Sequence, residues 1–127
     1  MYDDVLEEIC SICGTASGIT PRIGYLPTNG GVACYPNSGY NVHLSFQKET
    51  LIDSVTVLFN IKMTSQETAL QTAETMYYAL ITPKSYESTE DYTIMNIESS
   101  SVPTYVGRED EYFLYAFAVT VFLNRKG

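Results

Sequence analysis

The side chains best suited to metal binding or nucleophilic chemistry in this sequence are three cysteines and a single histidine. Cys10 and Cys13 are separated by two residues, whereas Cys34 and His43 stand alone. A zinc site uses four ligands, usually as two closely spaced pairs. Cys34 and His43 could complete a set of four, but Cys10 and Cys13 lie on the apolar stripe of a predicted helix, where core packing explains them. We therefore predict no metal site.

A thiol enzyme that pairs a Cys34 nucleophile with a His43 base is an alternative. His43 lies on the polar side of its predicted strand, where a surface residue is expected. A dithiol redox centre usually has its cysteine pair at the start of a helix that follows a strand. Cys10 and Cys13 lack that context, so neither thiol chemistry is favoured.

The carboxylates gather in residues 3–8 and 109–111, which are predicted to be a helix start and a solvated turn. Paired carboxylates need burial before they can take separate acid and base roles. Neither group has apolar neighbours that would bury it. The sequence therefore predicts no catalytic residue, no cofactor and no enzymatic activity.

The composition is that of a folded, acidic chain. Hydrophobic residues make up 45% of the sequence, and the formal net charge is −8. Proteins that bind nucleic acid neutralise phosphates with Lys and Arg, so this charge argues against such a function. No stretch approaches the ~20 apolar residues of a membrane span, and the acidic N-terminus shows no export signal. The odd number of cysteines indicates reduced thiols in a cytoplasm, and the length predicts one domain over residues 1–127.

Residues 3–13 form the first predicted helix. Asp3 or Asp4 caps it, and Gly14 ends it. Its apolar stripe follows three- and four-residue spacings and comprises Val5, Leu6, Ile9, Cys10, Ile12 and Cys13.

Residues 64–81 form the second and longer predicted helix. Thr64 accepts a hydrogen bond from the Glu67 amide in a capping box, and Pro83 prevents the helix from continuing. The apolar stripe comprises Ala69, Leu70, Ala73, Met76, Tyr77 and Leu80.

The region between these helices is predicted to be β-structure. Residues 23–26 and 32–35 predict two short strands joined by a hairpin, because an Asn-Gly pair favours the tight turn between them. Residues 36–39 predict a further turn. Alternating apolar and polar side chains then predict a half-buried strand over residues 42–46.

Longer strands are predicted on both sides of the second helix. Leu51–Met63 predicts a long strand whose residues 54–63 alternate polar even-numbered and apolar odd-numbered side chains, with Leu58 as the exception. After the polar segment 83–91, residues 92–97 predict a strand. Residues 99–106 predict an edge strand or extended loop, limited by a proline.

Residues 107–111 predict a charged turn into a final strand over residues 112–123, which is apolar on both faces. Such a strand needs cover on both faces. We expect its bulky odd-numbered face to pack under the second helix and its even-numbered face to meet a neighbouring subunit. The candidate subunit interface is Tyr112, Leu114, Ala116, Ala118, Thr120 and Phe122.

Strands that bunch together instead of alternating with helices predict an α+β fold. The expected architecture is a mainly antiparallel mixed β-sheet with one long helix packed on one face and a short N-terminal helix. Recognition is often carried by loops on a rigid sheet. Partner contacts are therefore predicted at Lys48, Glu49, Lys84, Tyr86, Glu87, Arg108 and Glu109.

Three motifs accompany these elements. A Tyr-Pro-x-x-Gly run ends the early strands at residues 35–39, a strand passes into a helix over residues 57–70, and a turn opens the last strand at residues 103–115. In this order they resemble the tail-terminator and minor capsid protein family of long-tailed bacteriophages and prophages. The acidic corner at residues 109–111 is shorter than the glycine-containing turn of that family.

The resemblance implies a non-enzymatic virion protein that forms a ring, often of six subunits. Such a ring caps the tail tube and offers the surface that joins the head. The implied partners are further copies of the chain, a tail-tube protein and a head–tail connector protein. The implied location is the virion, assembled in the bacterial host cytoplasm, with no membrane involved. DNA would pass without specific binding, and an acidic lumen suits that passage.

Two other functions remain open. One is a head-completion or connector protein, which stays within phage assembly. The other is a small cytoplasmic ligand-binding module with an apolar pocket between sheet and helix.

Overall fold

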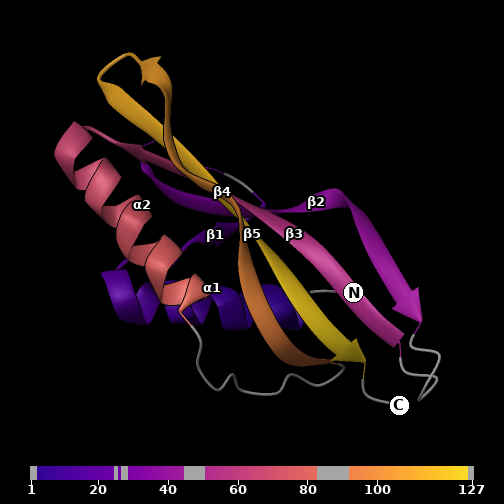
Figure 1. Cartoon of the computed structure of the whole chain (residues 1–127). Helices are drawn as coiled ribbons and strands as arrows, with labels where there is room; N and C mark the ends of the chain where they lie inside the picture. The colour runs from indigo at the N-terminus through magenta and orange to yellow at the C-terminus, as the bar shows by residue number, and fades with distance from the viewer. Residues whose placement is uncertain (1–2, 25, 27–28, 45–50, 83–91, 126–127) are drawn as a thin grey trace.

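The computed structural model describes residues 3–24, 26, 29–44, 51–82 and 92–125. Two helices and five strands follow one another along the chain (Figure 1). They are α1 (Asp3–Ser17), β1 (Arg22–Ile23), β2 (Gly31–Leu44), β3 (Leu51–Met63), α2 (Gln66–Ile81), β4 (Tyr92–Glu109) and β5 (Tyr112–Arg125).

The strands form one sheet in the order β1-β2-β3-β5-β4, and every described neighbouring pair is antiparallel except β1 and β2. The predicted α+β class is confirmed, with α2 packed on one face of a mostly antiparallel mixed sheet. Within the part of the chain that the structure describes, neither helix is long and apolar enough to cross a membrane.

Strand β5 lies inside the sheet and is hydrogen-bonded along nearly its whole length. Its pairing with β3 runs from Met63–Phe113 to Ile52–Asn124. On its other side it pairs with β4 as far as Tyr92–Arg125. Strand β4 is the outer strand, and its register shifts in four places along β5. Bulges of this kind, together with a proline, discourage an edge strand from pairing with foreign strands.

The core lies between the helices and one face of the sheet. Phe59 on β3 and Phe117 on β5 stack with ring centroids 4.6 Å apart, and the edge of Tyr77 on α2 meets Phe117 at 5.8 Å. The Tyr77 hydroxyl donates a hydrogen bond of 2.6 Å to Ser99 Oγ on β4. The expectation that the odd-numbered face of β5 packs under the second helix is therefore confirmed.

Helix α2 begins one residue later than predicted. Ser65 is its N-cap, and Ser65 Oγ accepts a hydrogen bond of 3.2 Å from the Thr68 amide. The predicted Thr64–Glu67 capping box is wrong because the extended backbone of the cap falls at Ser65. On the apolar stripe, Leu70 is 37% exposed, and Thr72 takes a buried place instead and donates to Met63 Sδ.

Helix α1 continues past Gly14, the predicted stop, to Ser17. Gly18 follows with a φ of 81°, a left-handed conformation that glycine adopts without strain, and its amide donates to Gly14 O at 2.8 Å. Gly14 instead allows close packing, because a Cβ there would meet Thr20 Oγ1 at 2.6 Å. The predicted stripe of α1 is buried except for Ile12, which is half-buried.

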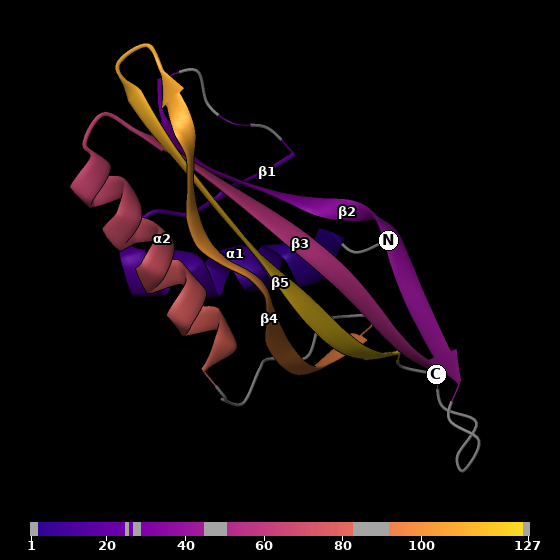
Figure 2. The ribbon, with the colours of Figure 1, turned by 45° about the horizontal axis from the view of Figure 1, so that its top comes forward.

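The early β region differs most from the predictions. The predicted hairpin over residues 23–35 is wrong, because β1 and β2 run parallel, with Arg22 opposite Ala33. The predicted turn at residues 36–39 is also wrong. Strand β2 continues through it as a bulge, since β3 pairs with β2 at both Pro36 and Tyr40, and β2 bends sharply along its length (Figure 2). Residues 45–46 of the next predicted strand lie outside the described residues.

The β4–β5 hairpin is tighter than predicted. Glu109 pairs directly with Tyr112, so the turn is only Asp110 and Glu111, and Asp110 has a φ of 54°. The predicted turn residues 107–109 belong to β4. At the far end, β5 extends beyond residue 123 to Arg125. The segment 83–91 lies outside the described residues.

Two leucines on α2 provide a matched test of this packing. Leu80→Ala is expected to lower the free energy of unfolding by about 2–5 kcal/mol, because Leu80 is fully buried and its removal leaves a cavity. Leu70→Ala is expected to change it by less than about 1 kcal/mol, because Leu70 lies at the surface. Urea titration followed by circular dichroism measures both, and equal losses would contradict the observed orientation of α2.

Candidate interaction surface

The face of the sheet opposite the helices is the candidate functional surface, here called the open face. Side chains alternate between the two faces of a strand. Because Val55, Val57, Phe59 and Ile61 belong to the helix-covered core, the side chains between them point the other way. On β3 these are Ser54, Thr56, Leu58, Asn60 and Lys62.

The six residues predicted as a subunit interface all fall on this open face. Each pairs across the sheet with β3 or β4, opposite residues of the same face. Ala118 is buried and the other five are half-buried: Tyr112, Leu114, Ala116, Thr120 and Phe122. Their role as an interface stays a prediction, but they lie side by side where a partner could reach them.

The centre of the open face is apolar and low. Leu58 lies directly opposite Ala118 and is 41% exposed. Ala116 and Ala118 have small side chains that leave the backbone of β5 close to the surface. Ala118 itself is buried by its neighbours, with 4% of its surface exposed. An element docked here could therefore approach the sheet closely around Leu58.

Polar side chains surround this centre. Thr56 and Thr120, paired across β3 and β5, lie with their hydroxyl oxygens 3.3 Å apart. Glu98 on β4 is exposed opposite Thr120. An apolar centre with a polar rim is the arrangement found in many protein–protein interfaces.

Lys62 lies at the end of the open face nearest the β4–β5 turn and is only 8% exposed. Its Nζ is 4.8 Å from the centre of the Tyr112 ring and 3.5 Å from Glu109 Oε1. The Glu109 side chain is 62% exposed, so solvent screens this ion pair and it stabilises little. Alternation places Lys62 on the polar face of its strand, whereas its burial beside the Tyr112 ring depends on the neighbouring strand β5.

The residues predicted to contact partners lie partly outside the described residues and partly on strand β4. Lys48, Glu49, Lys84, Tyr86 and Glu87 lie outside the described residues. Arg108 and Glu109 are strand residues rather than loop residues. The Arg108 guanidinium lies 5.1 Å from the Phe113 ring centre, and Arg108 Nε donates to Asp110 O at 3.0 Å, so Arg108 supports the hairpin itself.

Exposed apolar side chains on β4 were not predicted. Val102, Tyr105 and Val106 are each about half exposed or more, and they lie where the register of β4 shifts. A bulge removes the simple alternation from which burial is read in a sequence. Tyr105 lies opposite Tyr115 of the helix-covered face, with the ring centroids 5.4 Å apart, so it belongs to that side of the sheet.

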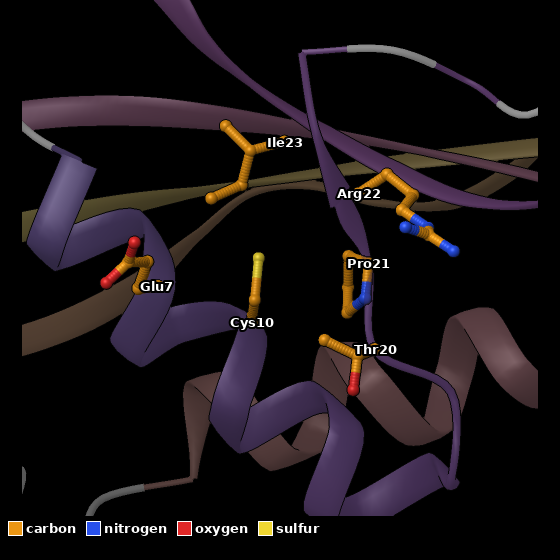
Figure 3. A pocket seen from close by; sticks show the side chains of 6 residues that line it. All are labelled: Glu7, Cys10, Thr20, Pro21, Arg22 and Ile23. Atoms are coloured by element: carbon orange, nitrogen blue, oxygen red, sulfur yellow. The ribbon is translucent and has the colours of Figure 1, made fainter.

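A separate groove of about 700 Å³ lies between α1 and the segment leading into β1 (Figure 3). Its lining residues are Glu7, Cys10, Thr20, Pro21, Arg22 and Ile23. A smaller hollow of about 280 Å³ lies at the start of α2 beside Lys62 and Tyr112. Among the described residues, no three His, Cys, Asp or Glu side chains gather in a way that could hold a metal ion.

All three cysteines are buried and outside any disulfide bond, and two of them are in contact. Cys10 Sγ and Cys34 Sγ are 3.4 Å apart. The hydrogen bond from the Cys34 thiol lowers the pKa of Cys10, and the same bond, together with burial, raises the pKa of Cys34 far above its usual range. While the reduced Cys10 accepts this bond, Cys34 keeps its proton and is unsuited to begin the nucleophilic attack weighed from the sequence. The side chain of His43 lies outside the described residues.

Comparisons with known proteins give a similarity in structure but none in sequence. No family model matches the chain, and no curated protein matches it. A solved structure described as the virion of a native gene transfer agent (GTA) particle contains a chain with a TM-score of 0.48 and 13% sequence identity. The match covers 92% of this chain and 82% of that chain. The likeness lies in the course of the backbone, and no residue of the open face is assigned from it.

Lys62→Met is expected to leave the free energy of unfolding unchanged or to raise it by about 1 kcal/mol. The methionine keeps apolar contact with Tyr112 and removes a buried charge whose desolvation is costly. Glu109→Gln is the control and is expected to change the free energy of unfolding by less than about 0.5 kcal/mol, because the Glu109 carboxylate is exposed to solvent. Chemical denaturation measures both, and a loss above about 2 kcal/mol for Lys62→Met would show a strongly stabilising ion pair instead.

Proposed function

We propose that this chain is a structural component of a phage or prophage virion, which assembles as a ring through the open face of its sheet and acts as a tail terminator. The proposal rests chiefly on β5, which is apolar on both faces while the described helices cover only one. Leu58, exposed at the centre of the uncovered face, marks where a neighbour would dock.

A ring follows if the open face of one copy meets a different surface of the next, because such head-to-tail contacts close when the rotation between copies allows it. The ring would cap the tail tube and offer the surface that joins the head. Its partners would be further copies, a tail-tube protein and a head–tail connector protein. It would be assembled in the bacterial host cytoplasm and then remain in the virion.

The charge of the chain supports a role beside passing DNA. The net charge of −8 repels phosphates, and two cations of the described strands are engaged locally, Lys62 with Glu109 and Arg108 with Phe113. An acidic lumen lets DNA slide without being held. DNA would therefore be a passing contact and not a specific ligand.

A head-completion or connector protein would use the same surface and differs only in its partner, so binding to tail tubes separates the two. The ligand-binding module requires an apolar cavity between the sheet and α2. That space holds the stacked Phe59 and Phe117 rings with Tyr77 against them. No observation on the described residues favours that function.

Leu58→Arg should abolish assembly and leave the fold intact, because a charged side chain at the centre of an interface must be desolvated without a partner. The matched control is Leu70→Arg, since Leu70 has nearly the same exposure, 37% against 41%, but lies on α2. Light scattering at high concentration and negative-stain microscopy, with and without tail tubes, measure assembly. Circular dichroism verifies folding.

The expected result is rings for the wild type and Leu70→Arg, and monomers for Leu58→Arg. A wild type that stays monomeric both alone and with tail tubes would overturn the proposal. If Leu70→Arg blocked rings as strongly as Leu58→Arg, a helix surface and not the open face would be the interface. Leu58 is a cleaner site than Ala118, because at 4% exposure a bulky replacement of Ala118 must displace its neighbours.

A further inference from the structure

Cys10 and Cys34 are far apart in the sequence but adjacent in the fold. Cys10 lies on α1 and Cys34 on β2, and their sulfur atoms are 3.4 Å apart. A disulfide bond has sulfurs ~2.05 Å apart, so the two side chains must close by about 1.3 Å. At this pair, α1 contacts the sheet through two thiol groups.

The two thiols differ in their access to solvent. Cys10 lines the groove between α1 and β1, and its sulfur points toward that groove between Ile23 and Pro21 (Figure 3). Cys34 is fully buried behind it and does not line the groove. A small oxidant entering the groove therefore meets Cys10 first, with Cys34 placed directly beyond.

The hydrogen bond between the thiols assigns them different chemical roles. The Cys34 thiol, acting as donor, stabilises the thiolate form of Cys10 and lowers the pKa of Cys10, although burial and, to a smaller extent, Glu7 oppose this shift. The same bond keeps the proton on Cys34. The thiolate is the form that attacks an oxidant, so Cys10, which lines the groove, is also the more reactive of the two thiols.

We propose that Cys10 is a peroxide-reactive thiol and Cys34 its resolving partner, so that oxidation links α1 to β2 by a disulfide. In the first step the Cys10 thiolate attacks hydrogen peroxide, the O–O bond breaks, and Cys10 sulfenic acid and hydroxide form. In the second step the Cys34 sulfur displaces the hydroxyl group from Cys10, giving the disulfide and water. Two thiols are oxidised by two electrons, and one peroxide is reduced to two waters.

Cys13 is the internal control for this chemistry. It lies three residues after Cys10 on the same helix and is also fully buried, but it does not line the groove. It should therefore stay reduced while the other two are oxidised. The proposal is independent of the proposed virion role, because it concerns only this contact within one chain.

The test uses the folded full-length chain, hydrogen peroxide and digestion with trypsin without reduction. Cleavage after Arg22 and Lys48 separates Cys34 from both N-terminal cysteines. The variant Cys13→Ala leaves Cys10 as the only thiol in the first peptide, so a cross-link between the two peptides is then unambiguous. In Cys34→Ala the sulfenic acid cannot be resolved and should be captured by dimedone on Cys10.

The expected result is that two of the three thiols disappear in the wild type and in Cys13→Ala, with a cross-link of Cys10 to Cys34. The melting temperature of the oxidised protein should also be several degrees higher than that of the reduced one, because the bond reduces the number of conformations open to the unfolded chain. Cys10→Ala should form no intramolecular disulfide while keeping a folded circular dichroism spectrum.

Three outcomes would overturn the proposal. The first is a Cys13–Cys34 cross-link as abundant as that of Cys10 to Cys34. The second is conversion of Cys10 to sulfinic acid while Cys34 stays free. The third is retention of all three thiols in the folded protein under peroxide that oxidises the denatured chain.

Discussion

Strand β5 must be hydrogen-bonded on both edges and covered on both faces, and most of the structure follows from this constraint. β3 and β4 satisfy its edges along almost its whole length. The helix-facing side is covered through the contact of Phe117 with Phe59 and Tyr77. The other side carries half-buried apolar groups that the described elements leave open, and this unmet requirement is the physical basis for the proposed assembly.

The two faces of the sheet differ because their side chains differ in size and polarity. Large aromatic and branched groups fill the space beneath the helices, where close packing contributes most to stability. On the open face, alanines and threonines alternate with a few larger groups, so the surface is low at its centre and polar at its rim. A neighbouring subunit can cover such a surface. The same surface can also stay exposed to water without a large loss of stability.

Helix α1 is joined to the sheet by a smaller set of contacts, in which the Cys10–Cys34 pair is central. The two thiols are both buried, but Cys10 lines the groove and Cys34 lies behind it. Packing alone explains Cys13, whereas the position of Cys10 beside both Cys34 and the groove allows chemistry that packing does not require. The same contact can therefore serve the reduced fold and a cross-linked one.

The sequence by itself determined the elements whose pattern is local. Helix α2, the full length of β3, the last strand and the face of that strand under the helix all follow from periodicity within one segment. Only the tertiary structure decided what depends on distant partners: the parallel pairing of β1 with β2, the bulge at residues 36–39, the burial of Lys62 and the meeting of Cys10 with Cys34. An Asn-Gly or Pro-Asn pair indicates where the chain can turn. Whether the chain direction reverses there depends on how the strands pair across the sheet. Alternation within β5 alone places the six predicted interface residues on one face, whereas the position of Leu58 at their centre depends on the pairing of β3 with β5.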